Sequence, residues 1–558
     1  MRTLLLAAAL VAFGSSSATA DDAPAEVLFV ADPQIHNMYG VGLKQMMLVS
    51  DLVSNVAIRH PEVNIAAPLT LRYALQQGQA RLARGKGMVV VLGDGTNIGC
   101  TGGAEAFKAE FDRLAQGSIW LQAHGNHDSY LIGTVNSYRP VEANELELTG
   151  TMQSPLPVDE SAWKPSSLEN LSNWNRYMRW RNWPDACYRP SVGGYPAGTP
   201  MNKIRWLARY TKYLEKHGLI LEPAGTSEGG GIAFTGTADS GKALHLMNYQ
   251  LHGIWYRPKA ATFSTLEEYQ EGWKSFIVQR ADIGATHTLV LIDTSVCPSA
   301  NGGLTKYWGS NAGTNGCLGT EQLSEISAMV GSIPKERSII VGGHFPLVAL
   351  EEAESRSLSR ILEQARPSGW TYVSGHTHNS LSGSIFGNGV DINIGSTTDW
   401  PLESHVMRFS PNSARVVEMD STVIGNPPRV LKYKPDRHSL GKRSELCRHY
   451  KVAEVLAEAR SEEHRNYWRS PSISWRECNR IEKNWKSSAE ELIGFQQRIS
   501  NRFDEPDGLY RDFILSIAAG ASYEEFTSFS IGKKAEDKWR KFARPRPASI
   551  VTIPGAPD

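Results

Sequence analysis

Side chains that bind metal ions recur in short clusters along this 558-residue chain. Carboxylate, amide and imidazole groups are the donors with which proteins hold divalent cations. Two such ions about 3.5 to 4 Å apart can hold the attacking and leaving oxygens of a displacement at phosphorus. The residue types therefore predict a two-metal hydrolytic centre. The clusters are Asp32-Pro33-Gln34, Gly93-Asp94-Gly95-Thr96-Asn97, Gly125-Asn126-His127-Asp128, Gly343-His344 and Gly375-His376-Thr377-His378.

Each cluster follows a short apolar run that is typical of a buried strand. In an open α/β sheet, ligands bind beyond the carboxyl ends of the strands. We therefore expect the five clusters to converge on one crevice. The predicted strands cover residues 27–30, 88–92, 119–121, 339–341 and 372–373.

The chemistry of the side chains suggests how they would share two ions. Asp94 follows a glycine that allows a tight turn, and its carboxylate is the natural bridge between the ions. Asp32 and His378 would complete one ion. His127 would not bind metal, but would face the phosphate with Asn126 or protonate the leaving group. The ligands that would complete the second ion are Asn126, His344 and His376.

Taken together, these motifs make the chain resemble a calcineurin-like metallophosphoesterase. The matching motifs, in chain order, are Asp32-x-Gln34, Gly93-Asp94-x-x-Asn97, Gly125-Asn126-His127-Asp128, Gly343-His344 and Gly375-His376-x-His378. They span about residues 27–420 and leave the C-terminal region unmatched. The resemblance implies an α/β fold, specifically a four-layer α/β/β/α sandwich, with a dinuclear centre and the ligand roles given above.

The chain departs from the family pattern at Gln34, where the family usually has a histidine. The amide oxygen of Gln34 can bind a hard ion, and His36 is the alternative ligand if the chain stays extended. An amide at this position favours Mn²⁺, with Mg²⁺, Fe or Zn²⁺ as alternatives. Asn97 stands where purple acid phosphatases carry a ligand tyrosine, so we expect no ferric centre. Asp128 would support catalysis by bracing His127 or a loop backbone.

The apolar pattern also predicts how the chain is divided. Strands and helices alternate up to Asp128, which indicates parallel strands with crossover helices. Residues 21–428 would form the catalytic domain, with an aromatic-rich insertion at about 129–241. Its tryptophans and tyrosines, among them Trp206 and Tyr210, would pack a small core or form a substrate platform. Residues 429–558 would form a helical region with a loose tail. His124, His252 and His405 belong to no motif, so we expect them in structural roles.

The N-terminus resembles a secretory signal. Arg2 precedes a short apolar run, and Ala18-Thr19-Ala20 offers a cleavage site, so residues 1–20 predict export to the periplasm or outside the cell. No later run is long enough for a transmembrane helix. An exported chain with six cysteines favours disulfides. The pairs we favour are Cys297 with Cys317, Cys447 with Cys478, and, by elimination, Cys100 with Cys187.

The charge of the chain gives no sign of nucleic-acid binding, because 58 basic and 58 acidic residues cancel. The leading hypothesis is an exported hydrolase in which a metal-bound hydroxide attacks a phosphate ester or anhydride. The substrate would be a phosphorylated small molecule or a lipid headgroup. The alternative is a catalytically silent protein that uses the insertion and the helical region to contact a partner. The sequence leaves the oligomeric state open.

Overall fold

The structure is a computed structural model. It describes residues 25–35, 61–82, 88–97, 99, 101–113, 120–129, 201, 203–238, 248–256, 274–296, 316–378, 382–398, 402–410, 416–423, 500–501 and 504. The predicted signal, His36, most of the helical region and every cysteine except Cys317 lie outside these residues.

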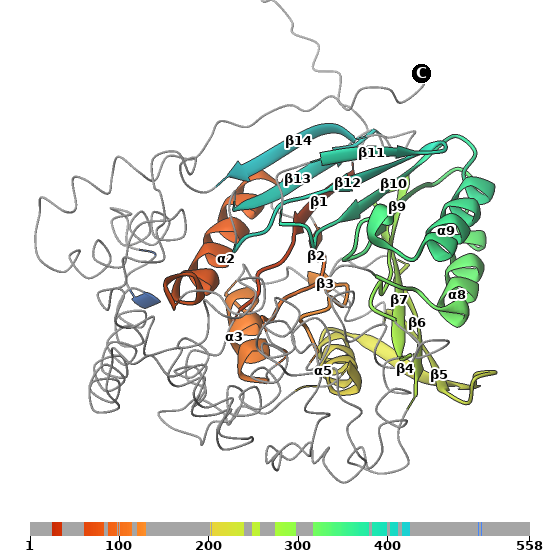
Figure 1. Ribbon diagram of the computed structural model, residues 1–558, viewed down its shortest axis with the longest axis horizontal. Helices are drawn as coiled ribbons and strands as arrows, with labels where there is room; N and C mark the ends of the chain where they lie inside the picture. Colours follow the sequence, from red (N-terminus) through yellow and green to blue (C-terminus); the bar gives the residue numbers. More distant parts are fainter. Residues whose placement is uncertain are drawn as a thin grey trace, which may run out of the picture.

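The described residues form a mixed α/β architecture with two large sheets and few helices (Figure 1). The smaller sheet has the strand order β14-β13-β1-β2-β3. Its strands β1, β2 and β3 are parallel, and β13 runs antiparallel to β1. The strands are β1 (Ala25–Val30), β2 (Met88–Val91), β3 (Trp120–Gln122), β13 (Glu403–Phe409) and β14 (Val416–Val423).

The larger sheet has nine strands in the order β11-β12-β10-β9-β8-β7-β6-β5-β4. Strands β8, β9, β10 and β12 are parallel, and the others join antiparallel. The strands are β4 (Leu219–Thr226), β5 (Ile232–Ala238), β6 (Gln250–Trp255), β7 (Phe276–Ile283), β8 (His287–Leu291), β9 (Ser338–Gly342), β10 (Trp370–Ser374), β11 (Ser382–Phe386) and β12 (Gly389–Asn393).

The alternation of side chains along the strands divides the apolar residues between two cores. On β9, Ile340 joins a core that also holds Val27 and Val89 of the smaller sheet. Its neighbours Ile339 and Val341 face the other way, into a core shared with α8 (Thr320–Gly331) and α9 (Glu352–Ala365). The two sheets therefore share one core, and α8 and α9 cover the other face of the larger sheet.

The remaining described helices lie beside the smaller sheet. Helix α2 (Pro61–Arg81) contacts β1, β13, β14 and α3 (Thr101–Phe111), and α5 (Lys203–Lys216) packs near β3 and β4. The buried Arg72 of α2 pairs with Glu110 of α3 at 2.7 Å and donates to the carbonyl of Ser500 at 3.1 Å. This arginine therefore ties a residue of the C-terminal region to two helices.

The predicted strands are confirmed as β1, β2, β3, β9 and β10, with ends that differ by one or two residues. The sequence pattern predicts a loop at residues 60–68 and a helix near residues 69–83. The start of this helix is wrong, because α2 begins at Pro61 and contains Pro68. A proline inside a helix removes one hydrogen bond, but the buried Leu69, Leu71 and Leu75 fasten the helix to the core. Residues 203–238, which we assigned to the insertion, form α5, β4 and β5.

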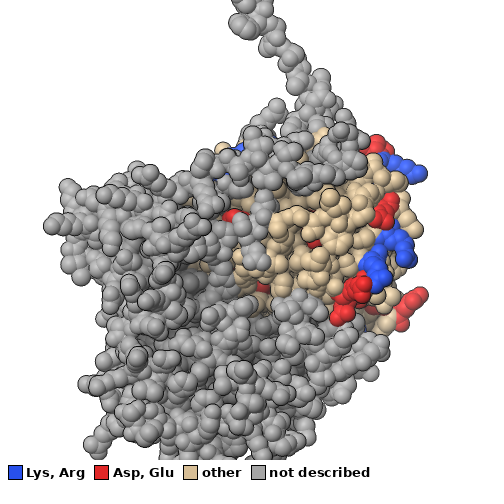
Figure 2. All heavy atoms as spheres, turned by 45° about the horizontal axis from the view of Figure 1, so that its top comes forward, with Lys and Arg blue, Asp and Glu red and all other residues tan. Residues whose placement is uncertain are grey.

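Cys317 is disulfide-bonded, and its partner lies outside the described residues. Among the described helices, none is both long and apolar enough to cross a membrane. On the face in Figure 2, the basic and acidic side chains of the described residues alternate along one edge. Neither sign of charge forms a separate patch in this view.

Candidate metal centre

The structure brings the predicted metal ligands together at the carboxyl ends of strands from both sheets. Asp32, Asp94 and Asn126 follow β1, β2 and β3 of the smaller sheet, whereas His344 follows β9, and His376 and His378 follow β10 of the larger one. One donor atom each from Asp32, Asp94 and His344 lies within 4.8 Å of the others. All three side chains are fully buried. This is the geometry of a cation site.

The backbone at the centre is strained. Among the described residues, seven that are not glycine have a positive φ, and five of these are Asp32, Gln34, Asp94, His376 and His378. Such conformations are costly for residues with a side chain and concentrate at functional sites, where the surrounding structure holds them. The fold therefore accepts strain in order to aim these side chains.

Two glycines allow the close approach of the clusters. A Cβ atom on Gly125 would lie 2.2 Å from Oδ1 of Asp94, and one on Gly93 would lie 2.7 Å from Nδ1 of His344. Gly93 also has a φ of +84°, which favours glycine. These glycines are part of the site because any side chain in their place would displace a predicted ligand.

The hydrogen bonds of His344 leave a lone pair facing the centre. Its Nδ1 lies 2.8 Å from the carbonyl oxygen of Leu92, which can only accept, so Nδ1 carries the proton. Burial lowers the pKa of His344, so the ring is neutral and Nε2 is unprotonated. This Nε2 faces Oδ1 of Asn126 at 2.8 Å and Oδ2 of Asp94 at 3.4 Å. A cation among these acceptors would satisfy them.

The second half of the centre contains Asp32, Gln34 and His378. Nε2 of His378 lies 3.0 Å from Oδ1 of Asp32. Nε2 of Gln34 lies 3.0 Å from Oδ2 of Asp94 and 3.0 Å from Nε2 of His378, and its Oε1 has no partner among the described residues. Rotating the side-chain amide of Gln34 by half a turn would place Oε1 between Asp94 and His378, because the two orientations of the amide occupy the same space. The position thus suits an oxygen ligand.

The two buried carboxylates need positive charge. Burial and the nearby Asp32 raise the pKa of Asp94 well above its usual value. Burial also opposes ionisation of Asp32, but the pKa of that carboxyl is lowered, mainly by the charge and the hydrogen bond of His378. Like charges in a dry site do not ionise together without a counter-charge. One or two divalent cations would supply it, so the donor set fits the metals that the sequence predicts.

His127 and Asp128 do not belong to the cluster of ligand atoms. Nδ1 of His127 lies 2.6 Å from the carbonyl oxygen of Asn97, and its Nε2 lies 4.0 Å from Oδ2 of Asp94. The carboxylate of Asp128 accepts from the amides of Thr96 and Gly125 at 3.1 and 3.0 Å. Asp128 therefore braces the backbone, and His127 is oriented by Asn97.

Several supporting residues were missed in the sequence. Lys203 of α5 pairs with Asp293, which follows β8, at 2.9 Å, and Oδ1 of the same Asp293 lies 3.8 Å from Nδ1 of His124. Oγ1 of Thr294 accepts from the amide of His344 at 3.1 Å. The sequence does contain a signal for Asp293 and Thr294, because Asp293-Thr294-Ser295 is another polar cluster after an apolar strand.

The segment after β12 also supports the centre. Oγ of Ser396 donates to the carbonyl of Asp32 at 2.8 Å, and the amide of Thr397 donates to the carbonyl of Ala31 at 3.1 Å. Thr398 donates to the carbonyl of Pro33. These bonds hold the strained backbone around Asp32.

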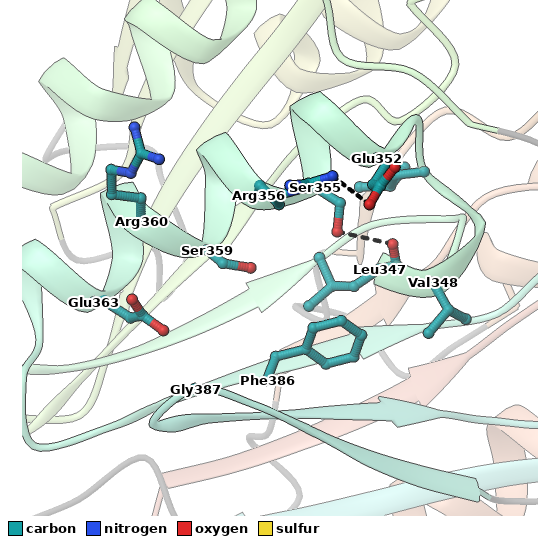
Figure 3. A pocket seen from close by; sticks show the side chains of 11 residues that line it. Leu347, Val348, Glu352, Ser355, Arg356, Ser359, Arg360, Glu363, Phe386 and Gly387 are labelled. Carbon is teal, nitrogen blue, oxygen red and sulfur yellow. Dashed lines mark hydrogen bonds and ion pairs between the residues drawn. The ribbon is translucent and has the colours of Figure 1, made fainter.

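A separate hollow of about 530 Å³ lies between α9 and the turn that joins β11 to β12. Figure 3 shows Phe386 facing Leu347 across it, beneath the polar side chains of α9. The helix side chains are partly engaged, since Arg356 pairs with Glu352 and Ser355 donates to the carbonyl of Leu347. None of the predicted metal ligands lines this hollow.

Comparisons with known proteins give little further information. No family model matches the sequence, and no curated protein matches it. A dimetal phosphatase from Danio rerio is similar in structure, with 11% sequence identity and a TM-score of 0.32, over 72% of this chain and 96% of that chain. A similarity this low identifies neither family nor function, and both must be argued from the geometry of the centre.

Proposed function

We propose that this chain is an exported, metal-dependent phosphoesterase of the calcineurin-like type, which hydrolyses a phosphate ester or anhydride at a dinuclear centre. The observation that carries this proposal is the convergence of donor atoms from the buried Asp32, Asp94 and His344 within 4.8 Å, with strained backbone at both aspartates. Two sheets with a shared core and outer helices support the four-layer arrangement of that family.

Each side chain has a role that its contacts suggest. Asp94 would bridge the ions, Asp32, Gln34 and His378 would hold one, and the ligands of the other would be Asn126, His344 and His376. When bound, divalent ions supply the positive charge that polarises a phosphoryl group and activates water. We favour Mn²⁺ because Gln34 offers an amide oxygen in place of an imidazole.

His127 would handle the proton of the leaving group. Since its Nδ1 is held by the carbonyl of Asn97, Nε2 is the atom that can donate a proton or a hydrogen bond. Asp128 keeps this loop in place through the amides of Thr96 and Gly125. Protonated His127 would also stabilise charge on the phosphoryl oxygens.

The test is an activity assay with para-nitrophenyl phosphate and its bis ester after reconstitution with Mn²⁺, Mg²⁺ or Zn²⁺. We expect chelation to abolish turnover and Asp94→Ala to abolish both metal binding and turnover. His127→Ala should keep the metal and lower kcat about 10²- to 10⁴-fold. His252→Ala is the matched control, because this histidine pairs with Glu325 away from the centre. Full activity of the His127 or Asp94 variant would refute the mechanism.

Two other parts of the proposal have separate tests. Export predicts that the secreted chain lacks residues 1–20, which N-terminal sequencing would show. The rival function, a silent binding protein, predicts stoichiometric metal without turnover on phosphomonoesters, phosphodiesters, nucleoside diphosphate sugars or phospholipids. We favour the enzyme because His127, which is not a predicted metal ligand, is oriented by the carbonyl of Asn97 beside an otherwise complete ligand set.

A further inference from the structure

We propose that a second pocket, behind the turn formed by residues 125–128, binds a planar aromatic anion. The pocket has a volume of about 320 Å³ and lies between α3, β3 and α5. It adjoins the candidate metal centre through Asp128, but none of the predicted metal ligands lines it. The inference does not rest on phosphoester hydrolysis.

The walls of this pocket are aromatic. Phe107 comes from α3, Trp120 from β3, and Trp206 and Tyr213 from α5. The rings are mutually ordered, since Trp120 stacks on Tyr213 with centroids 4.2 Å apart, and Phe107 meets Trp120 edge-on at 5.4 Å. Their exposed fractions are only 4% to 6%. These rings hold one another in place, so a flat apolar group could pack against their exposed edges without reordering the side chains.

The mouth of the pocket is positively charged. Lys212 and Lys216 lie one turn apart on α5, are exposed, and form no ion pair with any described residue. The other two cations at the mouth, Lys108 and Arg209, are paired with Asp112 and Glu105. Lys212 and Lys216, which pair with no acidic group in the described part of the chain, therefore create a positive potential that attracts an anion at the entrance.

The buried residues at the floor of the pocket determine the orientation of the ligand. Asp128 and Gln122 lie there, and Oδ2 of Asp128 accepts from Nε2 of Gln122 at 3.2 Å. A buried carboxylate disfavours an anionic group at the floor. The ring should therefore enter first, with its charge left at Lys212 and Lys216. A ligand in this position would contact the turn that carries Asn126 and His127.

The test uses naphthalene-2-sulfonate, a flat anion without a phosphoryl group, titrated calorimetrically into the full-length chain loaded with Mn²⁺. We expect saturable binding of one molecule per chain. The neutral analogue 2-naphthol lacks the charge, and methanesulfonate lacks the ring, so both should bind at least about tenfold more weakly. Equal binding of 2-naphthol, or no binding of the sulfonate, would overturn the proposal.

Two variants locate the binding in this pocket. Lys212→Gln with Lys216→Gln changes exposed residues only, and it should weaken binding about five- to tenfold. Ala104→Trp fills the pocket from α3 and should abolish binding. Lys335→Gln with Arg360→Gln is the charge-matched control and should leave binding unchanged. Unaltered binding in the lysine variant would place the ligand elsewhere, even if the tryptophan variant fails to fold. Asp94→Ala should still bind the sulfonate, which separates this pocket from the metal centre.

Discussion

At the scale of single residues, the centre combines groups that are easy to recognise in a sequence with one that is not. His344, His376 and Asp94 follow glycines in a pattern that predicts a metal centre, and the structure brings them together. Gln34 is the departure, and its contacts with Asp94 and His378 place it among the ligands. The identity of the ion that Asp32, Gln34 and His378 would hold therefore depends on the side-chain amide of Gln34.

Gln34→His should change metal preference. An imidazole favours Zn²⁺ more than an amide does, so we expect affinity for Zn²⁺ to rise about tenfold relative to Mn²⁺. Competition with a fluorescent chelator measures the two affinities. Gln34→Ala should lose one metal equivalent, whereas His36→Ala should not. If the His36 variant loses the metal and the Gln34 variant keeps it, His36 is the ligand.

Asp391 predicts a pH dependence of stability that is independent of the centre. Burial raises its pKa to about 7, although the amide of Leu347 and the hydroxyl of Ser374 donate to its carboxylate. The unfolded chain has a pKa near 4, so the folded state binds the proton more tightly. This contribution to stability is complete below about pH 4 and is lost as the pH rises through about 7.

Asp391→Asn removes the titration. Its amide oxygen can still accept from the amide of Leu347, and its NH₂ group can donate to the hydroxyl of Ser374 in place of the bond that Asp391 accepts. We expect the free energy of unfolding of the unaltered chain, measured with urea, to fall by a few kcal/mol relative to the variant between about pH 4 and 8. Other carboxylates and histidines titrate equally in both proteins, so the difference isolates Asp391. Parallel curves for the two proteins would show that the raised pKa is absent.

At the scale of elements, the strands were predictable and their supports were not. A buried parallel strand is a continuous apolar run, so β1, β2 and β9 are visible in the sequence. Helix α2 begins at Pro61, where the sequence predicts a loop, because burial of the leucines after Pro68 stabilises the helix across the proline. Lys203 could not be predicted to reach Asp293, because an ion pair between distant elements leaves no periodic signal.

The pair of Lys203 with Asp293 should be a strong tie between α5 and the end of β8. Both side chains are at most 2% exposed, so Lys203→Met leaves a buried carboxylate without its partner. We expect a loss of about 3 to 5 kcal/mol in the free energy of unfolding. Lys203→Met combined with Asp293→Asn should recover part of it.

Lys108→Met provides the matched control for that loss. Lys108 of α3 forms an exposed ion pair with Asp112, which follows the helix, and exposed pairs contribute about 0 to 1 kcal/mol. Urea unfolding of the three variants at one pH gives the comparison. If Lys203→Met lowers the free energy of unfolding no more than Lys108→Met does, the pair of Lys203 with Asp293 is solvated.

At the scale of the whole molecule, the candidate centre joins the two sheets. Asp32, Asp94 and Asn126 extend from the smaller sheet, and His344, His376 and His378 extend from the larger one. The shared apolar core already holds the sheets together, but the polar ends of the strands have buried acceptors facing one another. A cation there would bind the folded chain and not the unfolded one, because the unfolded chain does not assemble the ligands.

Metal loading should therefore raise the unfolding temperature of both sheets together. At a free Mn²⁺ concentration of about 100 times Kd, the stabilisation is about 2.7 kcal/mol for one site. Calorimetry with Mn²⁺ and with excess chelator measures the shift. His344→Ala removes a ligand of one ion on the larger sheet and should reduce the shift, whereas Asp94→Ala removes the bridging ligand on the smaller sheet and should abolish it. An unchanged shift in both variants would mean that Mn²⁺ binds elsewhere, whereas a reduced shift in His344→Ala and no shift in Asp94→Ala would show that the centre spans the two sheets.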